Sequence, residues 1–222
     1  MREEPILETT GDPAVRGVLH RPESAKAALV LTHGAGSDCN APLLVAVSRA
    51  FAEAGYAVLR IDLPFRQRRP HGPPPPGAAS LDQAGLIRAV ELLRSILSVE
   101  IFLGGQSYGG RQATMVAAER PELAAGLLLL SYPLHPPGKA AQQRTRHFSQ
   151  LRAPALFVQG TRDPFASPEE IEAATGLTSG KSSLVLVEGA GHDLGYGRKR
   201  ANAGLVPLIV SRFLEFIGDA RV

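Results

Sequence analysis

Ser107 is the residue whose surroundings most clearly suggest chemistry. It lies in the sequence Gly-Gly-Gln-Ser-Tyr-Gly-Gly at residues 104–110, directly after a short apolar run. The pattern G-x-S-x-G is typical of a sharp strand-to-helix turn that exposes a nucleophilic hydroxyl group. Such a turn strains the serine backbone, and Gly105 and Gly109 avoid collisions because they lack side chains. A glycine-rich turn that only packs a strand against a helix would use the same residues. Whether the chain also offers chemical partners for Ser107 therefore decides between a catalytic turn and a packing turn.

His192 and Asp163 are the candidate partners. A serine hydroxyl needs a nearby base to become a nucleophile at neutral pH, and the base needs an acid that orients it. Each of the two residues follows a short apolar run, and open α/β sheets form their sites beyond the carboxyl ends of strands. Asp193 is a poorer acid, because a residue next to the histidine cannot easily reach the far nitrogen of the ring. Asp163 could instead be a simple turn residue, since Asp-Pro sequences favour turns.

Two backbone amides are candidates for an oxyanion hole. One is the N–H group of Tyr108, immediately after the serine, where the start of a helix favours negative charge. The other is that of Ala35, in the small-residue loop His-Gly-Ala-Gly-Ser at 33–37. A tight packing turn would also explain this loop. We expect His33 itself to be structural and to bond to the backbone beneath the site.

The remaining histidines and the single cysteine suggest no chemistry of their own. Four histidines lie in polar or proline-rich surroundings and are predicted at the surface: His20, His71, His135 and His147. Cys39 follows the glycine loop and is expected to be a buried or cleft-lining thiol. With one cysteine, no internal disulfide can form.

Alternating apolar runs and helical patterns must position these groups. Six short apolar runs predict buried parallel strands: 28–31, 57–61, 101–103, 127–130, 155–158 and 184–187. Helical spacing predicts helices between or after them: 43–54, 80–97, 115–120 and 205–217. Ser80 is expected to cap the second of these helices, with Gln83 three residues on. The alternation implies a parallel sheet with helices on both faces, and residues 15–19 suggest added antiparallel strands.

Four arginines could contact substrate. Residues 66–77 are arginine-rich and then proline-rich, which predicts an exposed, stiff loop after a strand. Arg66, Arg68 and Arg69 in this loop could recognise a carboxylate or phosphate group. Arg111, one turn after Ser107, could line the same pocket. Ordinary surface arginines would give the same pattern.

The chain resembles the α/β-hydrolases over nearly its whole length. Five segments carry the resemblance: LTHGAGSDCN at 31–40, RIDLPF at 60–65, FLGGQSYGGR at 102–111, GTRDPF at 160–165 and GAGHD at 189–193. It is similar to small lid-less members, the dienelactone-hydrolase-like and testis-expressed-protein-like hydrolases. The resemblance implies one α/β-hydrolase domain over 1–222, with about eight mostly parallel strands, no large cap domain and a triad of Ser107, Asp163 and His192. Dienelactone hydrolases proper carry a cysteine at the elbow, so their substrate does not transfer.

These patterns predict a serine hydrolase that cleaves a carboxylic ester or thioester of a small molecule. There are two alternatives. The protein could be a non-catalytic scaffold of the same fold, or it could be an amidase or peptidase with the same triad. A net charge of +3 without a lysine-rich stripe argues against nucleic-acid binding. No spacing typical of metal ligands or of a phosphate-binding loop occurs, so we expect no metal and no cofactor. Without a signal peptide or an apolar segment of about 20 residues, we expect a cytoplasmic protein that does not enter membranes.

Overall fold

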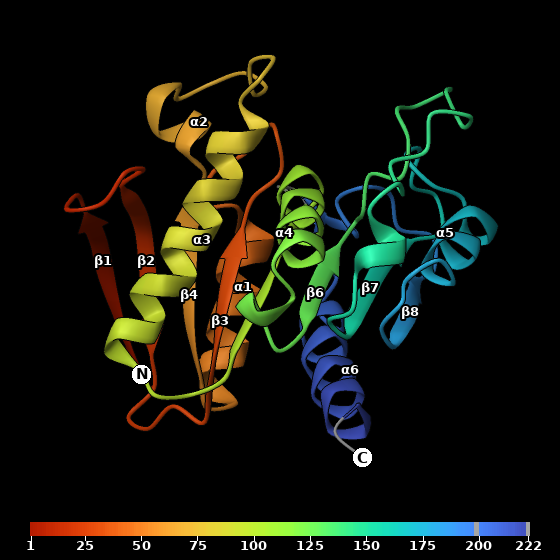
Figure 1. The fold of residues 1–222 in the computed structure, drawn as a ribbon. Coiled ribbons are helices and arrows are strands. Elements are labelled where there is room, and N and C mark those ends of the chain that lie inside the picture. The colour runs from red at the N-terminus through yellow and green to blue at the C-terminus, as the bar shows by residue number, and fades with distance from the viewer. Residues whose placement is uncertain (198–199, 221–222) are drawn as a thin grey trace.

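The computed structural model describes residues 1–197 and 200–220, and its centre is an eight-stranded sheet (Figure 1). In chain order the strands of this sheet are β1 Arg2–Glu8, β2 Val15–Arg21, β3 Ala27–Thr32, β4 Tyr56–Asp62, β5 Ile101–Gln106, β6 Leu127–Leu130, β7 Ala155–Gly160 and β8 Ser182–Val187. A separate pair, β9 Tyr196–Gly197 and β10 Arg200–Ala201, forms a two-stranded sheet. All six strands predicted from apolar runs are present, β6 with the predicted bounds and the other five with slightly wider ones. The expectation that all six are buried is wrong for β8, which is only partly buried because it lies at the edge of the sheet.

The order of the strands in the sheet produces a crevice in which a functional site can lie. The large sheet runs β1-β2-β4-β3-β5-β6-β7-β8, with β1, β2 and β4 paired antiparallel and the other neighbours parallel. From β3 the chain moves to one side into β4, and it then crosses back to the other side of β3 to form β5. In open α/β sheets a crevice forms where the order reverses in this way, outside the carboxyl ends of the strands. Here that point lies between the ends of β3 and β5, which precede the glycine loop and Ser107.

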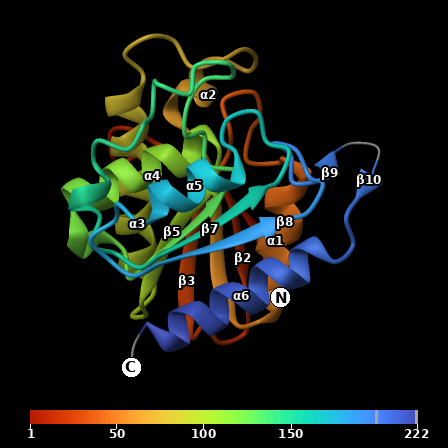
Figure 2. The ribbon, with the colours of Figure 1, turned by 90° about the vertical axis from the view of Figure 1, so that its right-hand side faces the viewer.

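Helices cover both faces of the sheet, as expected. They are α1 Pro42–Glu53, α2 Pro64–Arg68, α3 Ala79–Ile96, α4 Tyr108–Glu119, α5 Pro168–Thr175 and α6 Leu205–Asp219, with short 3₁₀ turns at Pro121–Leu123 and Phe148–Gln150. Buried residues of α3, α4 and α5 pack in one core cluster, and those of α1 and α6 pack in a second on the opposite face. Figure 2 shows the sheet between these two layers. The α2 helix, which follows β4, lies beyond the end of that strand at the top of Figure 1.

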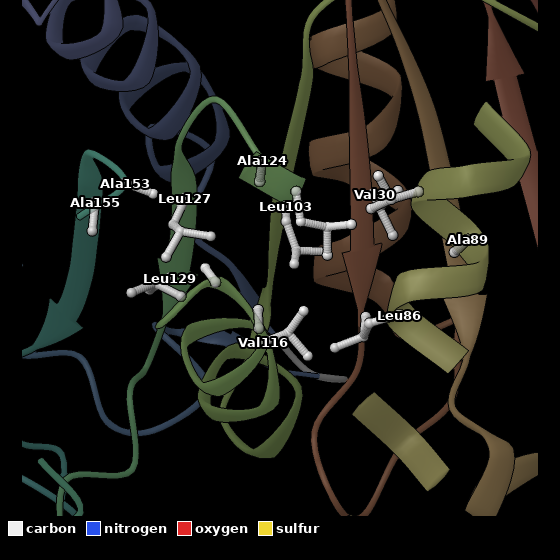
Figure 3. Packing of buried hydrophobic residues seen from close by; sticks show 14 of the residues in the cluster. Val30, Leu86, Ala89, Leu103, Val116, Ala124, Leu127, Leu129, Ala153 and Ala155 are labelled. Carbon is white, nitrogen blue, oxygen red and sulfur yellow. The ribbon is translucent and has the colours of Figure 1, made fainter. Parts of the chain in front are cut away.

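The packing of α3 and α4 fixes the start of α4 against the sheet (Figure 3). Leu86 of α3 and Val116 of α4 belong to the same buried cluster as Val30 of β3 and Leu103 of β5, and all four side chains are at most 2% exposed. Burying side chains of this size stabilises a fold by about 1.5–3 kcal/mol each. The helix that begins directly after Ser107 is thereby held firmly against the strand that precedes it.

The structure corrects the prediction for the start of α3. This helix begins at Ala79, and its N-cap is Ala78, which makes no side-chain capping hydrogen bond. Ser80 lies inside the first turn. The preceding chain turns at residues 75–78, where the Ala78 N–H group donates to the Pro75 carbonyl oxygen at 3.2 Å. Because Ala78 already has helical dihedral angles (φ −66°, ψ −21°), the helix begins before Ser80 could act as a cap.

Candidate active site

Ser107 occupies a strained turn between β5 and α4. Its φ is 51° and its ψ is −117°, a conformation that is costly for any residue with a Cβ atom. The glycines two positions before and after Ser107 are required because other backbone atoms approach them closely. A Cβ atom on Gly105 would lie 2.7 Å from the Thr32 carbonyl oxygen, and one on Gly109 would lie 2.6 Å from that of His33. The turn therefore presses against the end of β3, and only glycine fits at both flanks.

His192 lies between Ser107 and Asp163. Its Nε2 atom is 2.8 Å from the Ser107 Oγ atom, and its Nδ1 atom is 2.8 Å from Oδ2 of Asp163. A carboxylate accepts hydrogen bonds only, so Nδ1 carries the proton and Nε2 is free to accept the serine proton. Oδ2 of Asp163 also accepts a hydrogen bond from Gln159, and Oδ1 accepts one from the Phe165 amide. Both oxygen atoms of the buried carboxyl group are thus hydrogen-bonded.

Two loops bring the acid to the base. The Thr161 amide donates to the Val187 carbonyl oxygen at 3.1 Å, and the Arg162 amide donates to that of Ala190 at 2.9 Å. A Cβ atom on Gly160 would lie 2.3 Å from the Ala190 carbonyl oxygen, so glycine is needed for this approach. The loop after β8 is in this way fastened to the turn after β7, and the backbone bonds fix the spacing of Asp163 and His192.

A cleft of 340 Å³ opens above Ser107. Its lining comes from the glycine loop after β3, from the turn after β5 and from the loops after β7 and β8: Gly34, Ala35, Gly36, Ser37, Ala41, Gln106, Ser107, Phe165 and His192. The ring of Phe165 stacks on that of His192, with 4.2 Å between the centroids and an angle of 32°. The aromatic ring therefore covers one face of the base and limits how the imidazole can turn.

The peptide between Gly34 and Ala35 is oriented by His33. The Nδ1–H group of His33 donates to the Gly34 carbonyl oxygen at 2.8 Å, and Nε2 accepts from the Leu63 amide at 3.1 Å. Burial lowers the pKa of His33, which keeps the ring neutral so that one nitrogen can accept. In a trans peptide the carbonyl and N–H groups point in opposite directions. Holding the Gly34 oxygen therefore directs the Ala35 N–H group the other way, and the structural role expected for His33 is confirmed.

Ala35 and Tyr108 leave their amides available. Among the described residues, neither N–H group has a hydrogen-bond partner. A Cβ atom on Gly34 would lie 3.4 Å from the Ser107 Cβ atom, so the glycine loop is in close contact with the serine turn. Unpartnered donors beside a nucleophile can stabilise negative charge that forms on a substrate oxygen.

Arg66 differs from its predicted place in an exposed loop. Its side chain is buried, and its guanidinium group donates to four carbonyl oxygens, those of Ala35, Ser37, Arg69 and Gly72, at 2.8–2.9 Å. The reason is that the chain after β4 forms α2, which turns Arg66 inward beneath the glycine loop. Arg66 thus ties this loop to the arginine-rich segment and uses four of its five N–H donors within the protein.

The other three arginines are not part of the cleft lining. Arg68 and Arg69 are exposed, and Arg111 lines a separate hollow on α4. None of the three is among the residues that line the cleft above Ser107. A contact of Arg68 or Arg69 with an anionic substrate stays a prediction.

Several histidines predicted at the surface are buried instead. His20 and His135 are 0% and 5% exposed, and His147 is partly buried. Each has a polar partner in the fold: His20 accepts from Arg60, His135 bonds with Glu170, and His147 bonds with Thr114. Polar neighbours in the sequence misled the prediction, because these partners come from distant segments. His71 is exposed, as predicted.

Sequence reasoning missed the contacts that support Tyr108. Its hydroxyl group donates to Oδ2 of Asp82 at 2.7 Å, and Oδ1 of Asp82 accepts from the Phe65 amide at 2.9 Å. Burial raises the pKa of the Asp82 carboxyl group. This aspartate ties α3 to the serine turn and to α2. The only available signal was an acidic residue on the apolar side of a predicted helix.

Cys39 is buried, and burial raises the pKa of its thiol to about 12, which fits the inert role expected for it. Over residues 1–197 and 200–220, no group of three or more histidine, cysteine, aspartate or glutamate side chains could hold a metal ion. In the same described part of the chain, no helix is both long and apolar enough to cross a membrane.

Comparison with known proteins places this arrangement in a family. A family model described as an alpha/beta hydrolase domain matches residues 25–207. A dienelactone hydrolase from Anabaena variabilis has a TM-score of 0.76 at 22% identity, over 98% of this chain and 97% of its own. A serine hydrolase homologue from Coxiella burnetii has a TM-score of 0.75 at 20% identity, with coverage of 96% and 98%. A serine hydrolase without a lid from Xanthomonas campestris has a TM-score of 0.74 at 17% identity, with coverage of 96% and 95%.

The structural matches agree with the eight-stranded, mostly parallel sheet and with the absence of a large cap domain in the described residues. Only 131–154 separate β6 from β7, which is too short for a sizeable added domain. The resemblance seen in the sequence is confirmed by the family match over most of the chain. This chain belongs to the alpha/beta hydrolase domain family.

Proposed function

We propose that the protein is a serine hydrolase that cleaves a carboxylic ester or thioester through an acyl-enzyme on Ser107. The observation that carries the proposal is the continuous hydrogen-bonded line from Ser107 through His192 to Asp163, beside two unpartnered amides. A nucleophile, a base, an acid and an oxyanion hole are the groups that acyl transfer to serine requires.

The reaction would begin when the substrate carbonyl carbon lies near the Ser107 Oγ atom. Nε2 of His192 accepts the serine proton as Oγ bonds to the carbon, and the Ala35 and Tyr108 amides donate to the oxygen that becomes negative. Asp163 stabilises the imidazolium that forms. Collapse of the tetrahedral intermediate breaks the bond to the leaving group, which takes the proton from His192. Water then attacks the acyl-enzyme by the same steps in reverse order and releases the acid.

The preference for an ester or thioester rests on the open character of the site. The short connection between β6 and β7 has no room for a large cap domain, and small loops form most of the cleft wall. Such a site holds the substrate through few contacts. Esters and thioesters have better leaving groups than amides and need less binding energy to position them, whereas an amidase must also protonate a poor leaving group.

A fluorophosphonate probe, which reacts with activated serines, tests the nucleophile. The wild-type protein should be labelled, Ser107→Ala should not be, and the exposed Ser95→Ala on α3 should be labelled as the wild type is. Absence of labelling in the wild type, or equal labelling of Ser107→Ala, would reject catalysis and favour a binding scaffold.

A substrate panel tests the reaction class. We expect p-nitrophenyl esters and thioesters to turn over and aminoacyl anilides to remain intact. Faster cleavage of the anilides would replace the proposal by an amidase or peptidase. The panel should include esters with an acidic group: if Arg68→Ala and Arg69→Ala cleave these as well as the wild type does, those two arginines do not contact substrate.

A further inference from the structure

A second hollow, of 670 Å³, lies between α4 and the segment 141–150. Its described lining residues share no member with the cleft above Ser107. Arg111 of α4 contributes from one side, and Arg144, Arg146 and His147 contribute from the other. The remaining described lining residues are neutral, and none is acidic.

The positive charges of this hollow are not neutralised by the protein. Among the described residues, none of Arg111, Arg144 and Arg146 takes part in an ion pair with a carboxylate. The guanidinium group of Arg144 donates one hydrogen bond, to the Pro133 carbonyl oxygen at 3.1 Å. The Nε atom of Arg111 is buried and has no hydrogen-bond partner in the described structure.

Buried arginines elsewhere in the chain show the contrast. Arg66 donates to four carbonyl oxygens, and Arg60 donates to His20, to Asn40 and to the Cys39 carbonyl oxygen. Each of these two buried arginines thus makes at least three hydrogen bonds within the fold. The incomplete bonding of Arg111 and Arg144 sets them apart from those two.

The arginines are also close enough to repel one another. Burial lowers the pKa of Arg144, and the positive charge of Arg111 lowers it further. His147 is kept neutral, because burial and the charge of Arg111 lower its pKa to about 4. An anion between the two guanidinium groups would turn this repulsion into attraction, since each can donate two parallel hydrogen bonds to a carboxylate or phosphate.

We propose that Arg111, Arg144 and Arg146 form a binding site for a small oxyanion, the phosphate or carboxylate group of a small molecule, separate from the Ser107 cleft. Arg111 and Arg144 hold the anion from two sides, and the exposed Arg146 adds charge at the rim. The site does not depend on the proposed hydrolase activity, because it shares no residue with the cleft.

Thermal unfolding of the full chain tests the site, with inorganic phosphate and malonate as probes and potassium chloride added to keep ionic strength constant. The wild type should show a saturable rise in melting temperature with at least one probe. Arg144→Gln and Arg111→Gln should weaken the apparent affinity by at least about tenfold, the loss of one charge-assisted pair. A response to phosphate alone identifies a phosphate group, one to malonate alone a carboxylate, and one to both a general oxyanion site.

Three further variants keep the test decisive. Arg146→Gln alters an exposed side chain, so it tests the site even where Arg111→Gln fails to fold, and it should weaken binding. Arg120→Gln, at the end of α4 and outside the hollow, should bind like the wild type. Ser107→Ala should also bind like the wild type. No saturable shift in the wild type, an equal shift in Arg144→Gln and Arg146→Gln, or its loss in Ser107→Ala would overturn the proposal.

Discussion

Strain at Ser107 leads to a prediction about stability that is independent of any substrate. The serine has φ 51° and ψ −117°. Holding a residue with a Cβ atom in such a conformation lowers the stability of the folded state by about 1–3 kcal/mol. Glycine has no Cβ atom, so for glycine this conformation is equivalent to its mirror image near φ −51° and ψ 117°, which is an ordinary extended backbone. Replacing Ser107 by glycine should therefore release the strain.

The magnitude follows from two opposing contributions. Glycine also makes the unfolded chain more flexible, which costs about 0.5–1 kcal/mol of stability relative to alanine. Subtracting this cost from the strain leaves Ser107→Gly more stable than Ser107→Ala by about 1 kcal/mol. Both variants lose the hydrogen bond to His192 equally, so their difference isolates the backbone. In a chain of this size, 1 kcal/mol corresponds to about 2–4 °C in melting temperature.

Urea unfolding of the two variants measures this difference. Ser211, an exposed residue in the middle of α6, provides the matched control. There the order should reverse, with Ser211→Gly less stable than Ser211→Ala by about 1 kcal/mol, because glycine is a poor helix former. If Ser107→Gly were less stable than Ser107→Ala by as much as the Ser211 pair differs, the turn would not be strained and the elbow interpretation would fail.

Four further predictions concern the proposed chemistry and the buried groups. Asp163→Asn should lower kcat on an ester by about 10³–10⁴-fold, because an amide cannot stabilise the imidazolium; a loss below tenfold would contradict the assigned acid. Arg66→Met should lower kcat on a neutral ester about tenfold or more by releasing the Ala35 loop, whereas Arg68→Met should not. Cys39, with a pKa raised to about 12, should react with a thiol reagent at neutral pH only after unfolding in urea, so rapid labelling of the native chain would refute its burial. Burial lowers the pKa of His20 from 6.5 to about 4, so the unfolded chain binds more protons between these values. Stability should be fully present above pH 6.5 and fall towards pH 4, and His20→Gln should flatten this slope in urea unfolding measured across the range.

The parallel strands could be predicted because a strand covered on both faces is apolar along its whole length. The run 127–130 consists of four leucines and became β6, with every residue buried. The helix α5 was not predicted, although its signal is present in the sequence. Ser167 and Glu170 form a capping box at its start, and Pro168 occupies the first turn.

The surroundings of the site depended on contacts that the sequence does not reveal. Arg66 lies in a segment rich in arginine and proline, which reads as solvated surface, yet it is bonded to four carbonyl oxygens. Gln159 and Phe165 support Asp163 and His192, but neither residue type indicates a role of this kind by itself. The hollow around Arg111 combines α4 with a loop some 30 residues later, so its charge was not visible as a patch in the sequence.

The sequence by itself determined where the six predicted strands and most of the longer helices lie along the chain, and that Ser107, Asp163 and His192 follow strand ends. It could do so because burial and turn chemistry are local properties, read from apolar runs and glycine patterns. Only the tertiary structure decided the distances of 2.8 Å that join these residues, the orientation of the Ala35 amide and the burial of Arg66. These depend on how β3, β5, β7 and β8 lie side by side in the sheet, and strand order is set by packing between segments far apart in the chain.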